Sequence, residues 1–177
     1  MSELGPILKV KERVNRERFR IHLMKHNPFD PAIPDEERRK RHMMVWRDYA
    51  KETIEICNYA ASKLREIADF LDRNPLELAF SAPEEFKWWR NQAIKKARAS
   101  FHYITVMYRE GCIERPKGPT VIARVHLVPQ PVRDVAEGDI SKAPIAAGSL
   151  RDIVNMWVNA QKDWYEVIEF TSKGSPP

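Results

Sequence analysis

A stretch near the middle of the chain combines basic and aromatic side chains. It reads Lys87-Trp88-Trp89-Arg90-Asn91-Gln92-Ala93-Ile94-Lys95-Lys96-Ala97-Arg98 and contains no acidic residue. Adjacent residues point about 100° apart on a helix, so Trp89 can enter a core while Trp88 faces elsewhere. An exposed Trp88 would anchor a protein partner, whereas a covered one would pack under the N-terminal helix or a loop. Trp88 is therefore a candidate partner-binding residue.

The same stretch supports two other interpretations. Basic side chains neutralise phosphates, so RNA or DNA could bind through the five cations, which are Lys87, Arg90, Lys95, Lys96 and Arg98. A core helix with a solvated basic face explains the same pattern without a partner. A second basic block, residues 38–41, follows three acidic residues at 35–37, which can neutralise it within one helix.

Signatures of catalysis or cofactor binding are missing from the sequence. The six glycines are scattered, which argues against phosphate-binding and dinucleotide loops. Two distant cysteines cannot form a zinc site, and neither Glu-x-x-His nor the nucleophile elbow G-x-S-x-G occurs. His22 and His26 are four residues apart, but we interpret them as exposed polar residues, and His102 as a partly buried one. We therefore expect no enzyme, no cofactor and no metal.

The length of the chain predicts one domain, and we expect that domain to be intracellular. The chain has 177 residues and a net charge of +5, all of which arises from residues 1–113. A basic surface suits an anionic partner such as nucleic acid, an acidic protein or an anionic membrane surface. We read no secretory signal and no membrane span, and the cytoplasm and the mitochondrial matrix stay equally open. Cys57 is expected to be a small buried hydrophobic residue rather than half of a disulfide, as in a reducing compartment.

Residues 35–74 predict one long helix around which the chain is organised. They contain no Gly or Pro until Pro75, and acidic residues fill the first turn, where the helix dipole favours them. Steps of four and three residues connect a stripe of apolar or small side chains, which predicts a buried face. The stripe consists of Trp46, Ala50, Thr53, Cys57, Ala60, Leu64, Ile67 and Leu71.

The flanking segments predict three more long helices, a short helix that begins at Asn74-Pro75-Leu76-Glu77 after the long one, and one long loop. Residues 6–25 predict a basic amphipathic helix with Ile21 and Met24 on its apolar face, followed by a proline-rich elbow at 28–34. Residues 82–112 predict a helix whose buried face includes Trp89, Ala93 and Ala97, and a last helix spans 150–170, capped by Ser149. The prolines and glycines of 114–148 predict an extended loop with a strand-like stretch at 120–128. That stretch could pair with a partner's sheet edge through Val121, Ile122, Val125 and Leu127, form a hairpin with itself, or lie extended over the helices.

The sequence therefore predicts an all-α fold, a three- to four-helix bundle around the long helix at about 35–74. Its segments are a basic helix and elbow (1–34), a helical hairpin core (35–113), an extended proline-rich loop (114–148) and a C-terminal helix and tail (149–177), within a single domain. We expect a non-catalytic structural or accessory subunit of a larger multi-protein assembly, such as an organellar complex, a ribosome-like particle or a virion. A nucleic-acid-binding protein and an enzyme with an unpatterned helical site are the alternatives.

Overall fold

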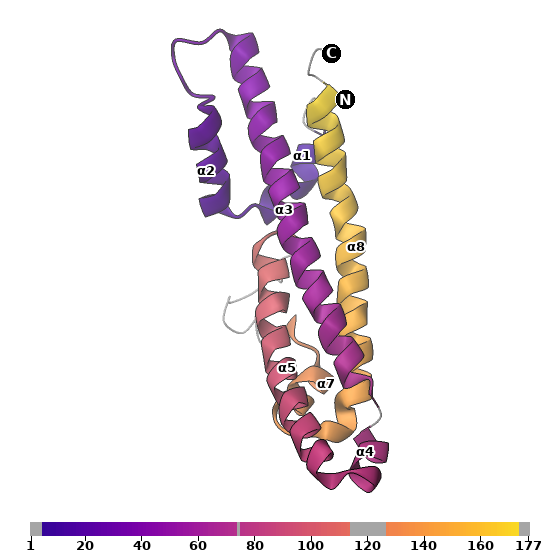
Figure 1. The fold of residues 1–177 in the computed structure, drawn as a ribbon. Coiled ribbons are helices and arrows are strands. Elements are labelled where there is room, and N and C mark those ends of the chain that lie inside the picture. The colour runs from indigo at the N-terminus through magenta and orange to yellow at the C-terminus, as the bar shows by residue number, and fades with distance from the viewer. Residues whose placement is uncertain (1–4, 74, 114–126, 174–177) are drawn as a thin grey trace. The chain divides into compact units, whose positions relative to one another are not determined.

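The computed structural model describes residues 5–73, 75–113 and 127–173, and these residues form helices and short connections with no β-strand among them (Figure 1). This confirms the predicted all-α class, while the arrangement as one three- to four-helix bundle stays a prediction. The elements are α1 (Gly5–Val10), the 3-10 helix η1 (Lys11–Arg13), α2 (Arg16–His26), α3 (Asp35–Leu71), α4 (Pro75–Ser81), α5 (Pro83–Arg109), α7 (Gln130–Ala136), the 3-10 helix η2 (Ile140–Lys142) and α8 (Ala143–Lys173). None of the helices in the described ranges is long and apolar enough to cross a membrane.

Helix α3 is the long helix that the sequence predicts. It begins at Asp35, as expected, and ends at Leu71, three residues before the predicted end. Seven of the eight residues of the predicted stripe are buried, and the eighth, Trp46, is half-buried. Apolar periodicity was a sufficient signal here because one face of the helix is covered along most of its length.

The predicted N-terminal helix at 6–25 is interrupted. Val14 adopts an extended conformation with ψ 131°, and the side chain of Asn15 then caps α2 by accepting a hydrogen bond from the Arg18 amide. Ile21 and Met24, predicted to lie on an apolar face that could pack against the long helix, are exposed. The prediction is wrong for these two residues because α2 meets α3 instead through Phe19, whose ring centre lies 4.7 Å from that of Trp46, and through the polar side chains described below.

Much of the predicted loop at 114–148 is helical. Pro131 lies in the first turn of α7, and α8 begins at Ala143 with Pro144 as its second residue, seven residues before the predicted start at 150. Ser149 is no cap, because its hydroxyl donates to the Ile145 carbonyl within α8. Proline is tolerated in the first turn of a helix, so prolines interpreted as loop residues mark helix starts.

The predicted strand-like stretch lies almost entirely outside the described residues. Val121, Ile122 and Val125 belong to the range 114–126, which the structure does not describe. Leu127 is described; it is half-buried and its backbone is helical, so the extended conformation predicted for it is wrong. The predicted partner contact of these four residues stays a prediction.

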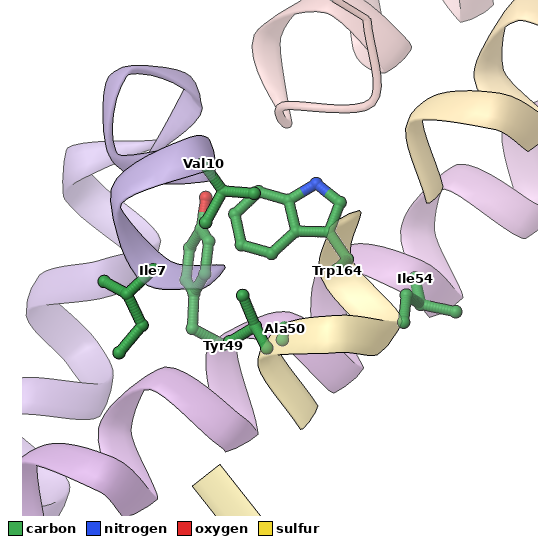
Figure 2. Packing of buried hydrophobic residues seen from close by; sticks show 7 residues of the cluster. Ile7, Val10, Tyr49, Ala50, Ile54 and Trp164 are labelled. Carbon is green, nitrogen blue, oxygen red and sulfur yellow. The ribbon is translucent and has the colours of Figure 1, made fainter. Parts of the chain in front are cut away.

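The chain forms two compact units, each of which is described by itself. Unit 1 contains residues 1–58, 108–115 and 158–177, and unit 2 contains residues 59–107 and 116–157. In unit 1, α1, α3 and α8 contribute to an apolar cluster (Figure 2). Its buried members are Ile7, Val10, Tyr49, Ala50, Ile54, Trp164 and Val167. This cluster fixes the N-terminal helix against the first half of α3.

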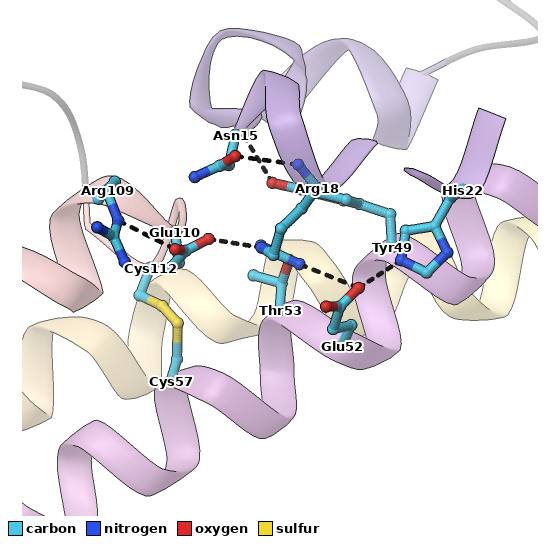
Figure 3. A network of polar contacts seen from close by, with 10 residues as sticks. All are labelled: Asn15, Arg18, His22, Tyr49, Glu52, Thr53, Cys57, Arg109, Glu110 and Cys112. Atoms are coloured by element: carbon cyan, nitrogen blue, oxygen red, sulfur yellow. Dashed lines mark hydrogen bonds and ion pairs between the residues drawn. A yellow bond between two sulfur atoms is a disulfide. The ribbon is translucent and has the colours of Figure 1, made fainter. Parts of the chain in front are cut away.

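A cluster of polar side chains lies beside that apolar cluster in unit 1 (Figure 3). Arg18 Nε donates to Glu110 Oε2 at 2.5 Å, and Arg18 Nη2 donates to Thr53 Oγ1 at 2.8 Å. The guanidinium also lies 4.4 Å from the centre of the Tyr49 ring, and Glu52 lies 3.5 Å from Nη1. The side chains of Arg18 and Glu110 are only 12% and 6% exposed, so their opposite charges must stabilise one another.

Two histidines attach α2 to α3. His22 Nε2 is hydrogen-bonded to Glu52, and His26 Nε2 lies 2.7 Å from Asp48 Oδ2. As the residue number rises by four along α2, the partner's number falls by four along α3, so the two helices run antiparallel. Our interpretation of His22 and His26 as exposed polar residues is wrong, because the elbow turns α2 back onto the acidic residues of α3.

Cys57 and Cys112 form a disulfide in unit 1, with their Cα atoms 6.2 Å apart. Both cysteines are fully buried. The prediction that Cys57 is an unpaired hydrophobic residue is therefore wrong. The helical stripe places Cys57 correctly but contains no information on which segment covers it. The cysteine-based argument for a reducing compartment fails with it, since disulfides are rare there, and the compartment stays a prediction.

Gly111 lies between α5 and the disulfide, at a position where the backbone conformation and the surrounding atoms leave no room for a side chain. Its φ of +86° is in the region that favours glycine, and a Cβ there would lie 2.5 Å from the Arg13 carbonyl oxygen. The indole nitrogen of Trp164 donates to the Gly111 carbonyl at 3.0 Å. The glycine thus permits the close approach that this hydrogen bond needs.

Unit 2 is organised around the stacked rings of Phe70 and Trp89, whose centres are 5.6 Å apart. These rings connect the end of α3 to the first half of α5. Arg151 connects α8 to the same end of α3 through ion pairs with Asp69 at 3.0 Å and Asp72 at 3.1 Å. Ala93 and Ala97 are fully buried on α5, as their spacing predicts.

Candidate interaction surface on helices α4 and α5

Helix α5 presents two opposite faces. Trp89, Ala93, Ala97, Ser100, Ile104 and Met107 are buried along one side of the helix. On the other side, five exposed residues follow steps of three and four, so they lie in one line along the helix. We call this line the outer ridge; it consists of Trp88, Asn91, Lys95, Arg98 and His102.

The two adjacent tryptophans have different environments. Trp89 is only 2% exposed, whereas Trp88 is 58% exposed. The Trp88 ring meets the ring of Phe70 in an edge-on arrangement, with the ring centres 6.4 Å apart. Of the two possibilities that the sequence left open for Trp88, the exposed one is observed. A large indole that retains most of its surface in water is typical of a residue that anchors a partner.

Helix α4 adds an apolar pair to this region. Leu76 and Phe80 are four residues apart on one face of the helix and are 68% and 90% exposed. They line a shallow hollow of about 610 Å³ together with Glu77 and Ser81. Only Ala82 separates α4 from α5, so the apolar pair precedes the outer ridge directly in the chain. We refer to the pair and the outer ridge together as the α4–α5 surface.

The five predicted cations have different partners. The Lys87 ammonium lies 3.6 Å from the Glu84 carboxylate. Lys96 is half-buried, and its ammonium lies 5.1 Å from the centre of the Phe70 ring. Lys95, Arg98 and Arg90 are exposed, and no ion pair links them to another described residue. Lys95 and Arg98 lie on the outer ridge, and Arg90 lies beside it. The ridge therefore presents positive charge that residues within the described part of the chain do not neutralise.

In the second basic block, residues 38–41, two of the four cations pair with the acidic residues that precede them. Arg38 pairs with Asp35 at 3.1 Å and Arg41 pairs with Glu37 at 3.3 Å, both within the first turns of α3. Arg39 and Lys40 are exposed and have no such pair among the described residues. Acidic residues thus neutralise half of this block, whereas the outer ridge of α5 contains none.

Sequence reasoning missed four residues of the α4–α5 surface. Leu76 and Phe80 were passed over because a seven-residue helix is too short for a clear periodic signal. Asn91 carries no distinctive chemistry on its own. His102 was expected to be partly buried because aromatic residues flank it, but it is exposed on the ridge. A search for residues opposite the Trp89–Ala93–Ala97 face would have found both Asn91 and His102.

The described residues contain no group of three or more His, Cys, Asp or Glu side chains placed to hold a metal ion. The α4–α5 surface itself combines indole, phenyl, amide, ammonium, guanidinium and imidazole groups. Such a set of groups is chemically capable of stacking, apolar contact and attraction of negative charge.

Comparison of the chain with protein-family models, with curated proteins and with solved structures found no match.

Proposed function

We propose that this protein is a non-catalytic helical subunit of a larger protein assembly and that it binds an acidic partner protein through the α4–α5 surface. The observation that carries the proposal is the exposure of Phe80 and Trp88 beside a fully buried Trp89. Large aromatic side chains contribute most of the binding energy at protein interfaces, where they fill pockets on the partner. The bundle arrangement of the helices belongs to the same proposal.

The charge of the outer ridge supports an acidic partner. Lys95 and Arg98 have no ion-pair partner among the described residues, so an interface that covers them must supply negative charge. Charge complementarity of this kind increases the rate of association and excludes cationic partners. Apolar anchors and unpaired cations on consecutive helices therefore favour a partner with acidic residues around an apolar pocket.

Nucleic acid is the second candidate, and the absence of acidic residues from the outer ridge favours it. Lys95 and Arg98 could contact phosphates while Trp88 stacks on an unpaired base. The exposed pair on α4 distinguishes the two candidates, because Leu76 and Phe80 offer apolar contact without positive charge. A protein partner would use both helices, whereas nucleic acid would use the ridge alone.

The experiment measures the native mass of the tagged protein after gentle lysis, with and without nuclease. The proposal predicts a particle larger than the 20.7 kDa chain that survives nuclease. Phe80→Ala with Trp88→Ala should release the chain from the particle, and Lys95→Glu with Arg98→Glu should do the same. A particle that nuclease dissolves and that the Phe80→Ala variant retains would instead establish nucleic-acid binding.

Matched control variants separate binding from folding. Met24→Ala removes an equally exposed apolar side chain, and Lys51→Glu with Lys162→Glu makes the same charge change at exposed lysines of unit 1. These controls should leave the particle intact. If they release the chain as well, the α4–α5 surface has no special role. A bare monomer in the unmodified protein would also contradict the proposal.

A further inference from the structure

Unit 1 contains a cavity of about 540 Å³ that the α4–α5 surface does not involve. It lies between the N-terminal helices and the first part of α3. Its volume falls within the usual range of small-molecule sites. The cavity is lined by Ile7, Leu8, Lys11, Asp35, Arg38, Arg39, His42, Met43 and Trp46.

The walls of the cavity are apolar. Leu8 is 51% exposed although it belongs to α1, whose neighbouring residue Ile7 is buried in the core. Met43 and Trp46 are half-buried and pack against the apolar cluster of unit 1 with only part of their surface. The remaining surface of these three side chains faces water, and an apolar ligand that covered it would gain the free energy of burial.

The rim of the cavity is basic. Lys11 and Arg39 are exposed, and no ion pair links either of them to another described residue. Arg38 is held in place by the Asp35 carboxylate at 3.1 Å and by the carbonyl oxygens of Pro28 at 3.2 Å and Asp30 at 3.3 Å. Asp35 is the single acidic residue among the nine that line the cavity, and Arg38 offsets its charge. A ligand at this rim therefore meets net positive charge.

His42 reports the same local environment. Burial lowers the pKa of His42, and the positive charge of Arg38 lowers it further. The neutral imidazole is thus favoured inside the cavity, whose electrostatic potential disfavours an additional cation. The same potential favours an anion.

We propose that this cavity binds a small anionic amphiphile, a monomeric straight-chain fatty carboxylate. Its chain would lie against Leu8, Met43 and Trp46, and its carboxylate would pair with Lys11 and Arg39. The apolar walls alone would accept any chain, but the basic rim selects the anionic head group. The cavity is large enough for such a molecule, whereas a folded partner segment would need a longer groove.

Calorimetric titration of the full-length chain with decanoate, below its micellar concentration, is the first test. We expect one site per chain. Decylammonium has the same chain with the opposite charge and should bind at least about tenfold more weakly, because the rim repels it. Acetate, which lacks the chain, should not bind. Equal affinity for decanoate and decylammonium, or no binding of decanoate, would overturn the proposal.

Substitutions at the rim test the head-group contact. Lys11→Ala and Arg39→Ala should each weaken decanoate binding by about three- to tenfold. Both side chains are exposed, so circular dichroism should show an unchanged fold. Lys40→Ala is the matched control, because Lys40 is exposed beside Arg39 but does not line the cavity. Loss of affinity in Lys40→Ala equal to that in Arg39→Ala would contradict a specific site.

Substitution of a wall residue tests the chain contact. Leu8→Asp places a carboxylate in the apolar wall and should abolish decanoate binding. Met24→Asp, at an exposed apolar residue of α2 outside the cavity, should leave it unchanged. Unchanged binding in Leu8→Asp would place the ligand elsewhere.

Contact quenching locates the chain. Decanoate that carries bromine at its last carbon quenches the fluorescence of a tryptophan that it touches, and Trp46 is the tryptophan that lines the cavity. Trp46→Phe should remove the quenching, and Trp88→Phe should retain it. Quenching that persists in Trp46→Phe would overturn the assignment. A membrane-binding role would also overturn the assignment. It would be shown by a chain that binds anionic phosphatidylglycerol vesicles through Lys11 and Arg39 but does not bind monomeric decanoate.

Discussion

The polar cluster of unit 1 and the outer ridge of unit 2 both contain basic side chains, but they use them differently. Arg18 is 12% exposed and pairs with Glu110, Glu52 and the Thr53 hydroxyl. Lys95 and Arg98 are exposed, and no described residue pairs with them. A buried charge must be neutralised within the fold, whereas an exposed one stays available. The first region therefore stabilises the chain, and the second is free to bind.

Removal of Glu110 should produce one of the largest effects. Glu110→Ala leaves the Arg18 guanidinium buried without its closest carboxylate and should lower the free energy of unfolding by about 3–5 kcal/mol. Lys95→Ala on the outer ridge should change it by less than about 0.5 kcal/mol. Urea denaturation followed by circular dichroism measures both. Similar losses in the two variants would remove the contrast between the regions.

The adjacent tryptophans test the same contrast within one helix turn. Trp89→Ala removes a buried indole that stacks on Phe70 and should cost about 3–5 kcal/mol of stability. Trp88→Ala should cost less than about 1 kcal/mol, because that ring is largely in water. Thermal or urea unfolding distinguishes the two. A Trp88→Ala variant as unstable as Trp89→Ala would show that Trp88 belongs to the core.

Loss of the disulfide should have a smaller but still clear effect. Cys57 and Cys112 are 55 residues apart in the chain, and a crosslink of that span typically contributes about 2–4 kcal/mol. Reduction of the bond, or Cys57→Ala with Cys112→Ala, should lower the free energy of unfolding by that amount. The urea midpoint of unfolding should fall with it. The same reductant should leave the double-alanine variant unaffected. Equal stability of the oxidised and reduced chains would contradict a stabilising role for this bond.

His42 should give the smallest effect, a dependence of stability on pH. Its pKa in the folded chain lies below that of the unfolded chain, so the unfolded state binds more protons between the two values. Stability should therefore fall as the pH is lowered through about 6.5 toward the folded pKa. His42→Gln should reduce this loss. Unfolding curves at pH 7.5 and pH 5.5 would show whether His42→Gln loses less stability than the unmodified chain. An identical loss in the two proteins would contradict this role of His42.

The parts of the fold that depend on local periodicity could be predicted from the sequence. The stripe from Ala50 to Leu71 and the buried face of α5 at Trp89, Ala93 and Ala97 follow the helical repeat, because each lies along the buried side of its helix. The starts of α7 and α8 could not be predicted from the sequence, because a proline in the first turn of a helix and a proline in a loop look alike in sequence.

Pairings between distant segments were beyond the sequence. The Cys57–Cys112 bond and the contacts of His22 and His26 with acidic residues of α3 depend on which segments meet, and periodicity does not specify that. The exposed state of Trp88 was one of two open alternatives for the same reason. The cavity beside Trp46 combines residues of α1, η1 and α3, none of which forms a recognisable motif alone.

The most direct test of the central claim is to identify what touches Trp88 in the cell. A photoreactive benzoylphenylalanine would replace Trp88 in one chain and the exposed control residue Lys51 in another. Binding of an acidic partner at the α4–α5 surface predicts a discrete crosslinked protein, rich in acidic residues, that forms from position 88 and not from position 51. A crosslink that nuclease removes, or equal products from both positions, would contradict it.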